Sequence, residues 1–336
     1  MFPWSATKPR LARSLDELYA DPALYRSSQD LLPPSEKLPH VLRFELTEGC
    51  SWGRCTYCTG FDHLPFRAKT TNEFQAHVEA VMARIGHDSR LAYQLKRIFI
   101  GGGNALAVPT EELRRAIAYA GDSFANRLDR TSAATRIALY GTTKDINAQG
   151  RLGIGKFYCD AGEYVGLGLI YWGVESGSDK VLKFVCKGDS KKRQLQAAEA
   201  LAKYPIRTSV MIMPGLGGTR FSEEHVRDTA EVLSAINPTY ITFLGINAAR
   251  GTSYARTMAD EERAGQNRLL SAREKATEMV EMIEAMKTYY PVTVGCFESG
   301  LDRVGKNPLT FGSRTLSGPG AKQVFVEELR AYLRHM

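Results

Sequence analysis

Strand-like and helical segments alternate six times between residues 41 and 244, and this alternation restricts the possible folds more than any other feature. The strand-like segments are short and apolar, whereas the segments between them carry apolar residues at helical spacing. The expected strands are residues 41–46, 97–100, 136–140, 165–174, 208–213 and 240–244. Parallel strands need long crossover connections, so the pattern favours a parallel sheet covered by helices. Six successive units predict an α/β fold, a partial TIM-type (β/α)6 barrel.

The two ends of the chain lack this alternation. Residues 1–40 are polar and Pro33-Pro34 interrupts them, which predicts an N-terminal extension with a short helix near Leu15–Tyr19. Beyond the last predicted strand, residues 264–289 have continuous helical spacing. We therefore expect three parts: an N-terminal extension (1–40), a (β/α)6 core (41–250) and a C-terminal helical and loop extension that covers the barrel (251–336).

Charge and apolar content narrow the class of protein. No stretch approaches the roughly 20 consecutive apolar residues that span a bilayer, and the N-terminus lacks an apolar signal core, so we expect a cytoplasmic protein without membrane contact. The net charge of +7 permits a phosphorylated small molecule, a nucleotide or RNA as partner. The basic residues are spread along the chain, however, and the densest run, Lys191–Arg193, also suits a solvated helix face. Nucleic acid is therefore not the expected partner.

Three of the six cysteines, Cys50, Cys55 and Cys58, lie within nine residues with the spacing C-x4-C-x2-C. Thiolates are soft ligands that suit zinc or iron–sulfur clusters. Structural zinc normally takes four protein ligands, and His63 is the available fourth. A [4Fe–4S] cluster held by three cysteines instead leaves one iron open to a substrate or cofactor. Both kinds of metal site remain open at this point.

The position of the cysteines favours the cluster. The cysteine segment, the Gly101–Asn104 turn, Glu175 and the Pro214–Gly218 turn each follow a predicted strand. Loops after the carboxyl ends of parallel strands converge on one mouth of a barrel, where chemistry usually takes place. A zinc site that only stabilises the fold has no need of this position.

At this point the chain resembles the radical S-adenosylmethionine (SAM) superfamily. Its cysteine loop follows the first strand and has an aromatic residue, Tyr57, directly before the last cysteine. The spacing is one residue longer than the common C-x3-C-x2-C. Gly101-Gly102-Gly103 resembles the superfamily's GGE turn, whose backbone binds the SAM amino group, but Asn104 stands in place of the Glu.

Other segments are similar to one branch of the superfamily, which contains coproporphyrinogen oxidase-like and methylthiotransferase-like enzymes. Gly173–Asp179 is similar to its G-x-E-S-G run, and Lys187-Gly188 matches the KG that often follows. The resemblance implies that Glu175 contacts SAM and that residues 241–246 border the adenine. It implies Cys50, Cys55 and Cys58 as cluster ligands and a SAM pocket formed by Tyr57, Gly101, Gly102, Gly103, Asn104, Tyr140, Glu175, Ser176, Met213, Gly215, Leu244 and Ile246.

The resemblance implies an enzyme in which a reduced [4Fe–4S] cluster cleaves SAM to give a 5′-deoxyadenosyl radical. We expect a small polar substrate, such as a phosphorylated molecule, a nucleotide or a sugar nucleotide in natural-product or cofactor biosynthesis. An external donor such as flavodoxin or ferredoxin would supply the electron. Two alternatives stay open: an RNA-modifying radical SAM enzyme, and a non-catalytic binding protein stabilised by zinc or a cluster.

A lid and several side chains are also predicted to contact the substrate. Residues 299–320 are long enough for a lid, and Cys296 ends a strand-like run, from which it would donate a hydrogen atom to a substrate radical. The other candidates are polar or aromatic side chains near the mouth: Tyr140, Tyr171, Trp172, Asn247, Arg250, Glu298 and Arg303.

Overall fold

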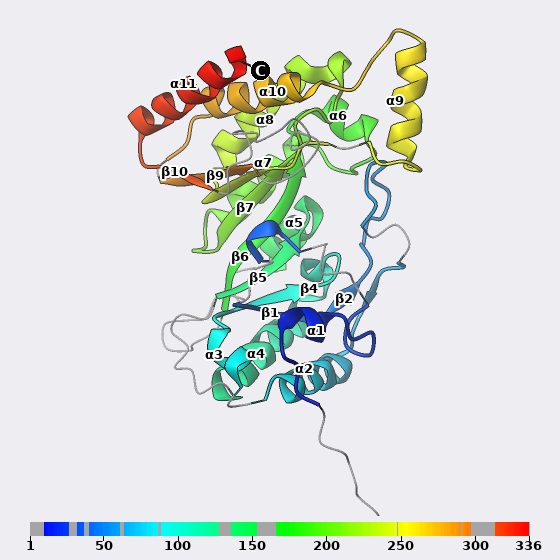
Figure 1. Ribbon diagram of the computed structural model, residues 1–336, viewed down its shortest axis with the longest axis vertical. Helices are drawn as coiled ribbons and strands as arrows, with labels where there is room; N and C mark the ends of the chain where they lie inside the picture. Colours follow the sequence, from blue (N-terminus) through cyan, green and yellow to red (C-terminus); the bar gives the residue numbers. More distant parts are fainter. Residues whose placement is uncertain are drawn as a thin grey trace, which may run out of the picture.

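One eight-stranded sheet organises the chain in a computed structural model (Figure 1). The structure describes residues 10–26, 32–36, 40–60, 64–86, 89–127, 136–152, 166–246, 248–289, 291–296 and 313–335. The strands lie in the order β1 (Val41–Glu45), β4 (Arg97–Gly101), β5 (Arg136–Gly141), β6 (Gly166–Glu175), β7 (Arg207–Ile212), β8 (Tyr240–Phe243), β9 (Val292–Cys296) and β10 (Arg314–Leu316). All neighbouring pairs are parallel except β9 and β10. The α/β partial barrel is confirmed, and β9, which matches the strand-like run that ends near Cys296, extends the six-stranded core together with β10.

Helices cover the outer face of this sheet. The longer ones are α2 (Thr71–Ile85), α4 (Thr110–Arg127), α5 (Thr143–Leu152), α7 (Lys191–Leu201), α8 (Ser222–Ile236), α10 (Ala272–Ala285) and α11 (Pro319–His335). Neighbours in this layer pack in the pairs α2–α4, α5–α7, α7–α8, α8–α10 and α10–α11. Shorter elements are α1 (Leu15–Tyr19), α3 (Arg90–Gln94), α6 (Asp179–Phe184), α9 (Ser253–Arg263), and the hairpin strands β2 (Thr47–Glu48) and β3 (Arg67–Ala68). Among the described segments, none of the helices has the length and apolar content to cross a bilayer.

Alternation along each strand divides the side chains between two environments. In β6, Trp172 belongs to the large core between sheet and helices, whereas Tyr171 belongs to a smaller cluster on the inner side of the sheet. Val41, Phe99 and Leu169 share that inner cluster. Any residue that reaches a substrate inside the partial barrel must therefore belong to this inner cluster or to the loops at the strand ends.

The N-terminal segment closes the amino end of the partial barrel. Leu32 joins the inner cluster, and the Tyr171 hydroxyl lies 2.6 Å from the Ser35 hydroxyl. The Arg97 guanidinium donates to the Ser35 carbonyl at 3.0 Å. The same segment appears in Figure 1 as the short blue helix in front of β5 and β6. The N-terminal segment therefore covers the end of the inner side opposite the carboxyl ends of the strands, where the loops predicted to carry chemistry lie.

The C-terminal part differs from the expected long helix over 264–289. It contains α9, which ends at Arg263, and α10, which begins at Ala272. Gly265 has a positive φ of 67°, and Ser271 and Glu274 form a capping box that starts α10 afresh. The expected lid falls mostly outside the described residues; its last part forms β10 and the start of α11, so a lid stays a prediction.

Candidate active site

The cysteine loop follows β2 and reaches across to α6 and α9, as the blue trace in Figure 1 shows. Two backbone hydrogen bonds attach it there. Thr56 N–H donates to the Val185 carbonyl at 3.0 Å, and the Thr56 carbonyl accepts from Tyr254 N–H at 3.0 Å. The side chains of Cys50, Cys55 and Cys58 are half-buried. The loop thus brings its thiols to the carboxyl end of the sheet, as the sequence predicted, and close to the surface.

The triple-glycine turn after β4 packs directly on the start of this loop. A Cβ added at Gly102 would lie 1.8 Å from the Thr47 carbonyl oxygen, and one at Gly103 would lie 1.8 Å from that of Gly49. Gly102 also has a φ of 105°, which side-chain-bearing residues rarely adopt. The two glycines therefore let the turn touch the cysteine-loop backbone, a role that the sequence comparison alone did not show.

The additional residue between the first two cysteines belongs to a turn that anchors the loop. Gly53 has a φ of 60°, and the neighbouring Trp52 donates its indole N–H to the Cys186 carbonyl at 2.7 Å. Gly188 makes room for the indole, because a Cβ there would lie 2.2 Å from the ring. The lengthened loop is thereby fixed to the connection between α6 and α7.

Glu175 ends β6 in a strained conformation and forms a nearly buried ion pair. A register irregularity between Gly173 and Glu175 and a φ of 61° at Glu175 turn its side chain back over Gly173. The Lys187 ammonium donates to its carboxylate at 3.1 Å, and the two side chains are only 13% and 11% exposed. Positive φ at a residue with a long side chain often marks a functional position.

The Glu175–Lys187 pair lies beside the cysteine loop and, after burial, most affects the pKa values of Cys55 and Tyr57. Burial raises the pKa of Cys55 to about 11, while the Lys187 ammonium opposes that rise. Burial and the Glu175 carboxylate raise the pKa of Tyr57 well above its ordinary value. Burial disfavours the charged form of Lys187, but Glu175 and the neighbouring Tyr57 and Cys55 still hold its pKa well above the usual range. The ammonium is thus retained next to the thiols.

Asn104, directly after the glycines, is fully buried and leaves one polar atom unused. Its amide N–H₂ donates to the Ser51 hydroxyl at 2.8 Å and to the Asp145 carboxylate at 2.5 Å. Its side-chain oxygen has no hydrogen-bond partner among the described residues. Buried oxygen atoms are nearly always satisfied, so an unpaired acceptor beside the cysteine loop fits a site that takes a ligand with a donor group.

A buried polar network supports the turn after β7. The Ser176 hydroxyl lies 2.8 Å from Nδ1 of His225, whose Nε2 lies 3.0 Å from the Met213 carbonyl. Gly215 N–H donates to the Glu278 carboxylate at 2.6 Å. Glu278 comes from α10, and the pattern of α10 gives no sign that this acid is buried. Sequence reasoning therefore missed it.

Lys275, one helical turn before Glu278 in α10, supports the turn that follows β8. Its ammonium donates to the carbonyl of Ile246 at 2.8 Å. Two charged residues of α10 therefore hold the turns after β7 and β8, both of which the resemblance placed in the SAM pocket. Burial raises the pKa of Glu278 to about 7.

An apolar cluster completes the mouth. Tyr57, Met213 and Ile246, which three separate segments supply, belong to one group of packed side chains. Leu244 follows β8 in the chain and is half-buried. Its backbone N–H donates to the Ile212 carbonyl. The predicted pocket residues of the cysteine loop and of the turns after β7 and β8 are thus brought together.

Several residues predicted to contact the substrate do not lie at the mouth of the partial barrel. Cys296 shares its side of β9 with Val292 and Val294 and belongs to the core between sheet and helices, so it faces away from the inner side. Trp172 lies in the same core and donates to the Thr143 hydroxyl at 2.9 Å. Tyr171 faces inward but bonds the N-terminal segment. Tyr140 faces inward beside Phe99, and Arg250 is exposed. Asn247, Glu298 and Arg303 lie outside the described residues.

The geometry of the thiols bears on the choice of metal. In the described part of the chain, no three His, Cys, Asp or Glu side chains converge to hold one metal ion. A single zinc ion binds its sulfur ligands at about 2.3 Å, and the thiolates of a cluster lie farther apart because each binds a different iron atom. His63, the suggested fourth zinc ligand, lies outside the described residues. Three soft donors beside an unpaired acceptor and a buried ion pair fit a cluster with a bound cofactor.

Comparison with known proteins agrees with this site. Residues 44–233, more than half of the chain, match the radical SAM superfamily. No curated protein matches the sequence. The cobalamin-dependent S-adenosylmethionine radical enzyme OxsB is similar in structure, with 12% identity and a TM-score of 0.52 over 75% of this chain and 44% of that one.

Coproporphyrinogen III oxidase from Escherichia coli is similar to the same degree, with 12% identity and a TM-score of 0.51 over 77% of this chain and 56% of that one. At such identities the likeness concerns the fold alone. The chain spans about half the length of these solved structures.

Proposed function

Because the chain belongs to the radical SAM superfamily, we propose that its site uses a [4Fe–4S] cluster and SAM to start radical chemistry on a small polar substrate. The cluster and SAM are the cofactors of this superfamily. The observation that carries the proposal is the position of Cys55 beside the buried Glu175–Lys187 pair. A cluster ligand and a pair of opposite charges suited to an amino acid lie together at the carboxyl end of the sheet.

Cys50, Cys55 and Cys58 are the proposed cluster ligands. Their loop is held by backbone bonds to the segments around Val185 and Tyr254, which fix its position at the carboxyl end of the sheet. Three cysteine ligands leave one iron open, and the nearby charges are where the amino and carboxylate groups of SAM would be oriented.

The chain offers separate contacts to the two ends of SAM. The Glu175 carboxylate accepts hydrogen bonds, the Lys187 ammonium donates them, and the unpaired Asn104 oxygen provides a further acceptor. Tyr57, Met213 and Ile246 form an apolar surface on which a purine would stack. The remaining members of the proposed SAM pocket are Gly101, Gly102, Gly103, Tyr140, Ser176, Gly215 and Leu244.

Bound SAM supplies a 5′-deoxyadenosyl radical when the reduced cluster provides one electron, and the cofactor thus carries the difficult chemistry. The protein must orient the substrate and keep water away. The N-terminal segment closes the amino end through Leu32 and Ser35. We propose that residues 41–250 form the catalytic core and that residues 251–336 cover it, with Glu278 and Lys275 fixing the two turns that border SAM.

The proposed substrate is a small polar molecule. Tyr140, which faces the inside of the partial barrel, suits a small polar molecule with a phosphate or carboxylate group, and a reduced flavodoxin or ferredoxin would supply the electron.

Anaerobic reconstitution with iron and sulfide tests the proposal. We expect a brown protein with about four irons per chain that releases 5′-deoxyadenosine from SAM under dithionite. Cys55→Ala should lose the cluster, whereas Cys186→Ala, which removes an exposed thiol outside the trio, should keep it. Colourless protein with one zinc per chain, or a full cluster in Cys55→Ala, would contradict the proposal.

A further inference from the structure

Asp145, in the first turn of α5, is a nearly buried carboxylate with no cation beside it in the described part of the chain. It is only 6% exposed. Its Oδ2 accepts hydrogen bonds from the Asn104 amide at 2.5 Å and from the Thr142 hydroxyl, and neither donor carries a charge. Its Oδ1 has no hydrogen-bond partner among the described residues. Burying a carboxylate without a counter-ion is costly, so this position suits a site that a cation completes.

A role at the start of the helix explains only part of this arrangement. Asp145 N–H donates to the Thr142 hydroxyl at 3.4 Å, and the helix dipole favours an acid in the first turn. An aspartate that has this role alone normally faces solvent. The helix start also leaves Asn104 unexplained, because its fully buried side-chain oxygen has no hydrogen-bond partner among the described residues. Two side chains in direct contact therefore each hold an unused acceptor atom, and one of them is charged.

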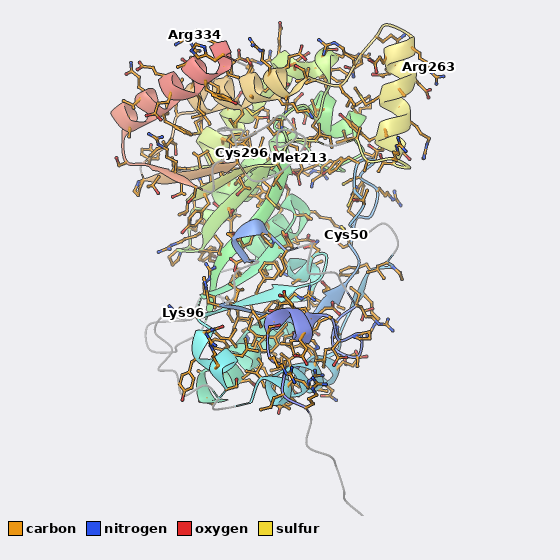
Figure 2. The ribbon with its side chains drawn as sticks, in the orientation of Figure 1. Cys50, Lys96, Met213, Arg263, Cys296 and Arg334 are labelled. Carbon is orange, nitrogen blue, oxygen red and sulfur yellow. The ribbon has the colours of Figure 1, made fainter. Side chains whose placement is uncertain are left out.

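Both side chains lie at the cysteine loop. Asn104 also donates to the Ser51 hydroxyl at 2.8 Å, and Ser51 directly follows Cys50. Figure 2 shows Cys50 on the opposite side of the molecule from Lys96, the residue before β4, so the carboxyl end of β4 brings Asn104 to the Cys50 side. The two unused acceptors thus adjoin the first of the proposed cluster ligands.

The other acids next to the cysteine loop are already paired with cations. They are Glu45 with Lys69, Glu48 with Arg26, Glu175 with Lys187 and Asp189 with Arg193. Of these acids and Asp145, only Asp145 lacks a cation within the structure described. Its negative charge is therefore the one that a bound ligand can neutralise.

We propose that Asp145, with the side-chain oxygen of Asn104, binds the ammonium group at the amino-acid end of SAM. The proposal rests on the proposed function, because it needs SAM at this site. An ammonium has three donors, and the two unused oxygen atoms accept two of them. Asp145 supplies a charge that Asn104 cannot, and hydrogen bonds between charged groups are the stronger ones. Asp145 belongs to none of the segments that resemble the superfamily. Lys187 is left to bind the carboxylate of SAM.

The test is a double-mutant cycle between this carboxylate and the amino group of a ligand. S-adenosylhomocysteine is the probe, because its sulfur is neutral and its ammonium is the only positive charge. The matched probe is the same molecule without the amino group. Titration calorimetry gives the dissociation constants of both for the anaerobically reconstituted protein. Asp145→Asn removes the charge and keeps the shape, Asp145→Ser is a smaller neutral variant, and Asp122→Asn removes an exposed charge from α4 as control.

We expect removal of the amino group to weaken binding to the wild type by at least about tenfold. The same removal should weaken binding to Asp145→Asn and Asp145→Ser much less, while Asp122→Asn should behave as wild type. A wild type that does not distinguish the two probes would overturn the proposal. It would also be overturned if the neutral variants weakened both probes alike, which is the result of a purely structural role. Wild-type protein that takes up no cluster, or binds neither probe, would instead contradict the proposed function.

Discussion

Replacing Gly103 by Ala should displace the cysteine loop, because the new methyl group has no room. Its Cβ would lie 1.8 Å from the Gly49 carbonyl oxygen and 3.0 Å from the Cys50 nitrogen. Both are backbone atoms, so no side-chain rotation relieves the overlap. Carbon–oxygen contacts ordinarily begin near about 3.3 Å, and the loop or the turn must therefore move by roughly 1.5 Å.

The expected cost follows from these contacts. Gly103 does not have a positive φ, so the change adds little backbone strain and acts mainly through overpacking, which typically costs about 1–3 kcal/mol. Alanine also lowers the entropy of the unfolded chain, which returns about 0.4–1 kcal/mol. We expect the free energy of unfolding to fall by about 1–2 kcal/mol. A shift of this size at Cys50 should reduce the iron content and lower the SAM cleavage rate by at least about tenfold.

Urea unfolding of the metal-free chain and iron analysis after anaerobic reconstitution measure these effects. Gly320→Ala is the matched control, because Gly320 lies in the first turn of α11 with nothing within 4 Å of its added Cβ. The control should retain or slightly gain stability. Wild-type stability and a full complement of iron in Gly103→Ala would refute the role of the glycine turn as a close support of the loop.

Other variants test the remaining contacts. Burial raises the pKa of Glu278 from 4.5 to about 7, so the folded state favours the protonated carboxyl. The stability that this preference gives the folded protein is fully present below about pH 4.5 and is lost as the pH rises to about 7. Glu278→Gln removes the titrating carboxyl, so the difference in free energy of unfolding between wild type and variant should change by up to about 3 kcal/mol across that pH range in urea unfolding. A difference that does not change with pH would contradict the raised pKa of Glu278. Lys187→Met should weaken SAM binding by at least about tenfold in equilibrium dialysis, while Lys183→Met should not, and equal affinities would remove Lys187 from the pocket. Trp52→Ala should speed the loss of iron to a chelator, because the indole bond to Cys186 and the packing on Gly188 disappear; an unchanged rate would show that the loop is held elsewhere.

The sequence predicted the features that follow from local pattern. The six strands of the core were located to within one or two residues, since apolar runs between helical segments mark buried parallel strands. The rule that carboxyl ends of parallel strands share one edge then brought the cysteine loop, Glu175 and the turn after β7 together. Cys55 beside Glu175 is the outcome of that topology.

Contacts between distant segments were not accessible in this way. Glu278 lies more than sixty residues beyond Gly215, and an acid within an amphipathic helix normally faces solvent. Nothing local to Gly103 shows that it touches Gly49. Cys296 was placed on the inner side because the predicted strand gave no register; its neighbours Val292 and Val294 show that it faces the helices.

Electron paramagnetic resonance of the anaerobically reconstituted, dithionite-reduced protein tests the central claim most directly. If Cys50, Cys55 and Cys58 hold a cluster with one iron open beside the Glu175–Lys187 pair, the spectrum should show a reduced [4Fe–4S] cluster and should shift when SAM is added. A spectrum without this signal, or a cluster signal that SAM leaves unchanged, would contradict the account.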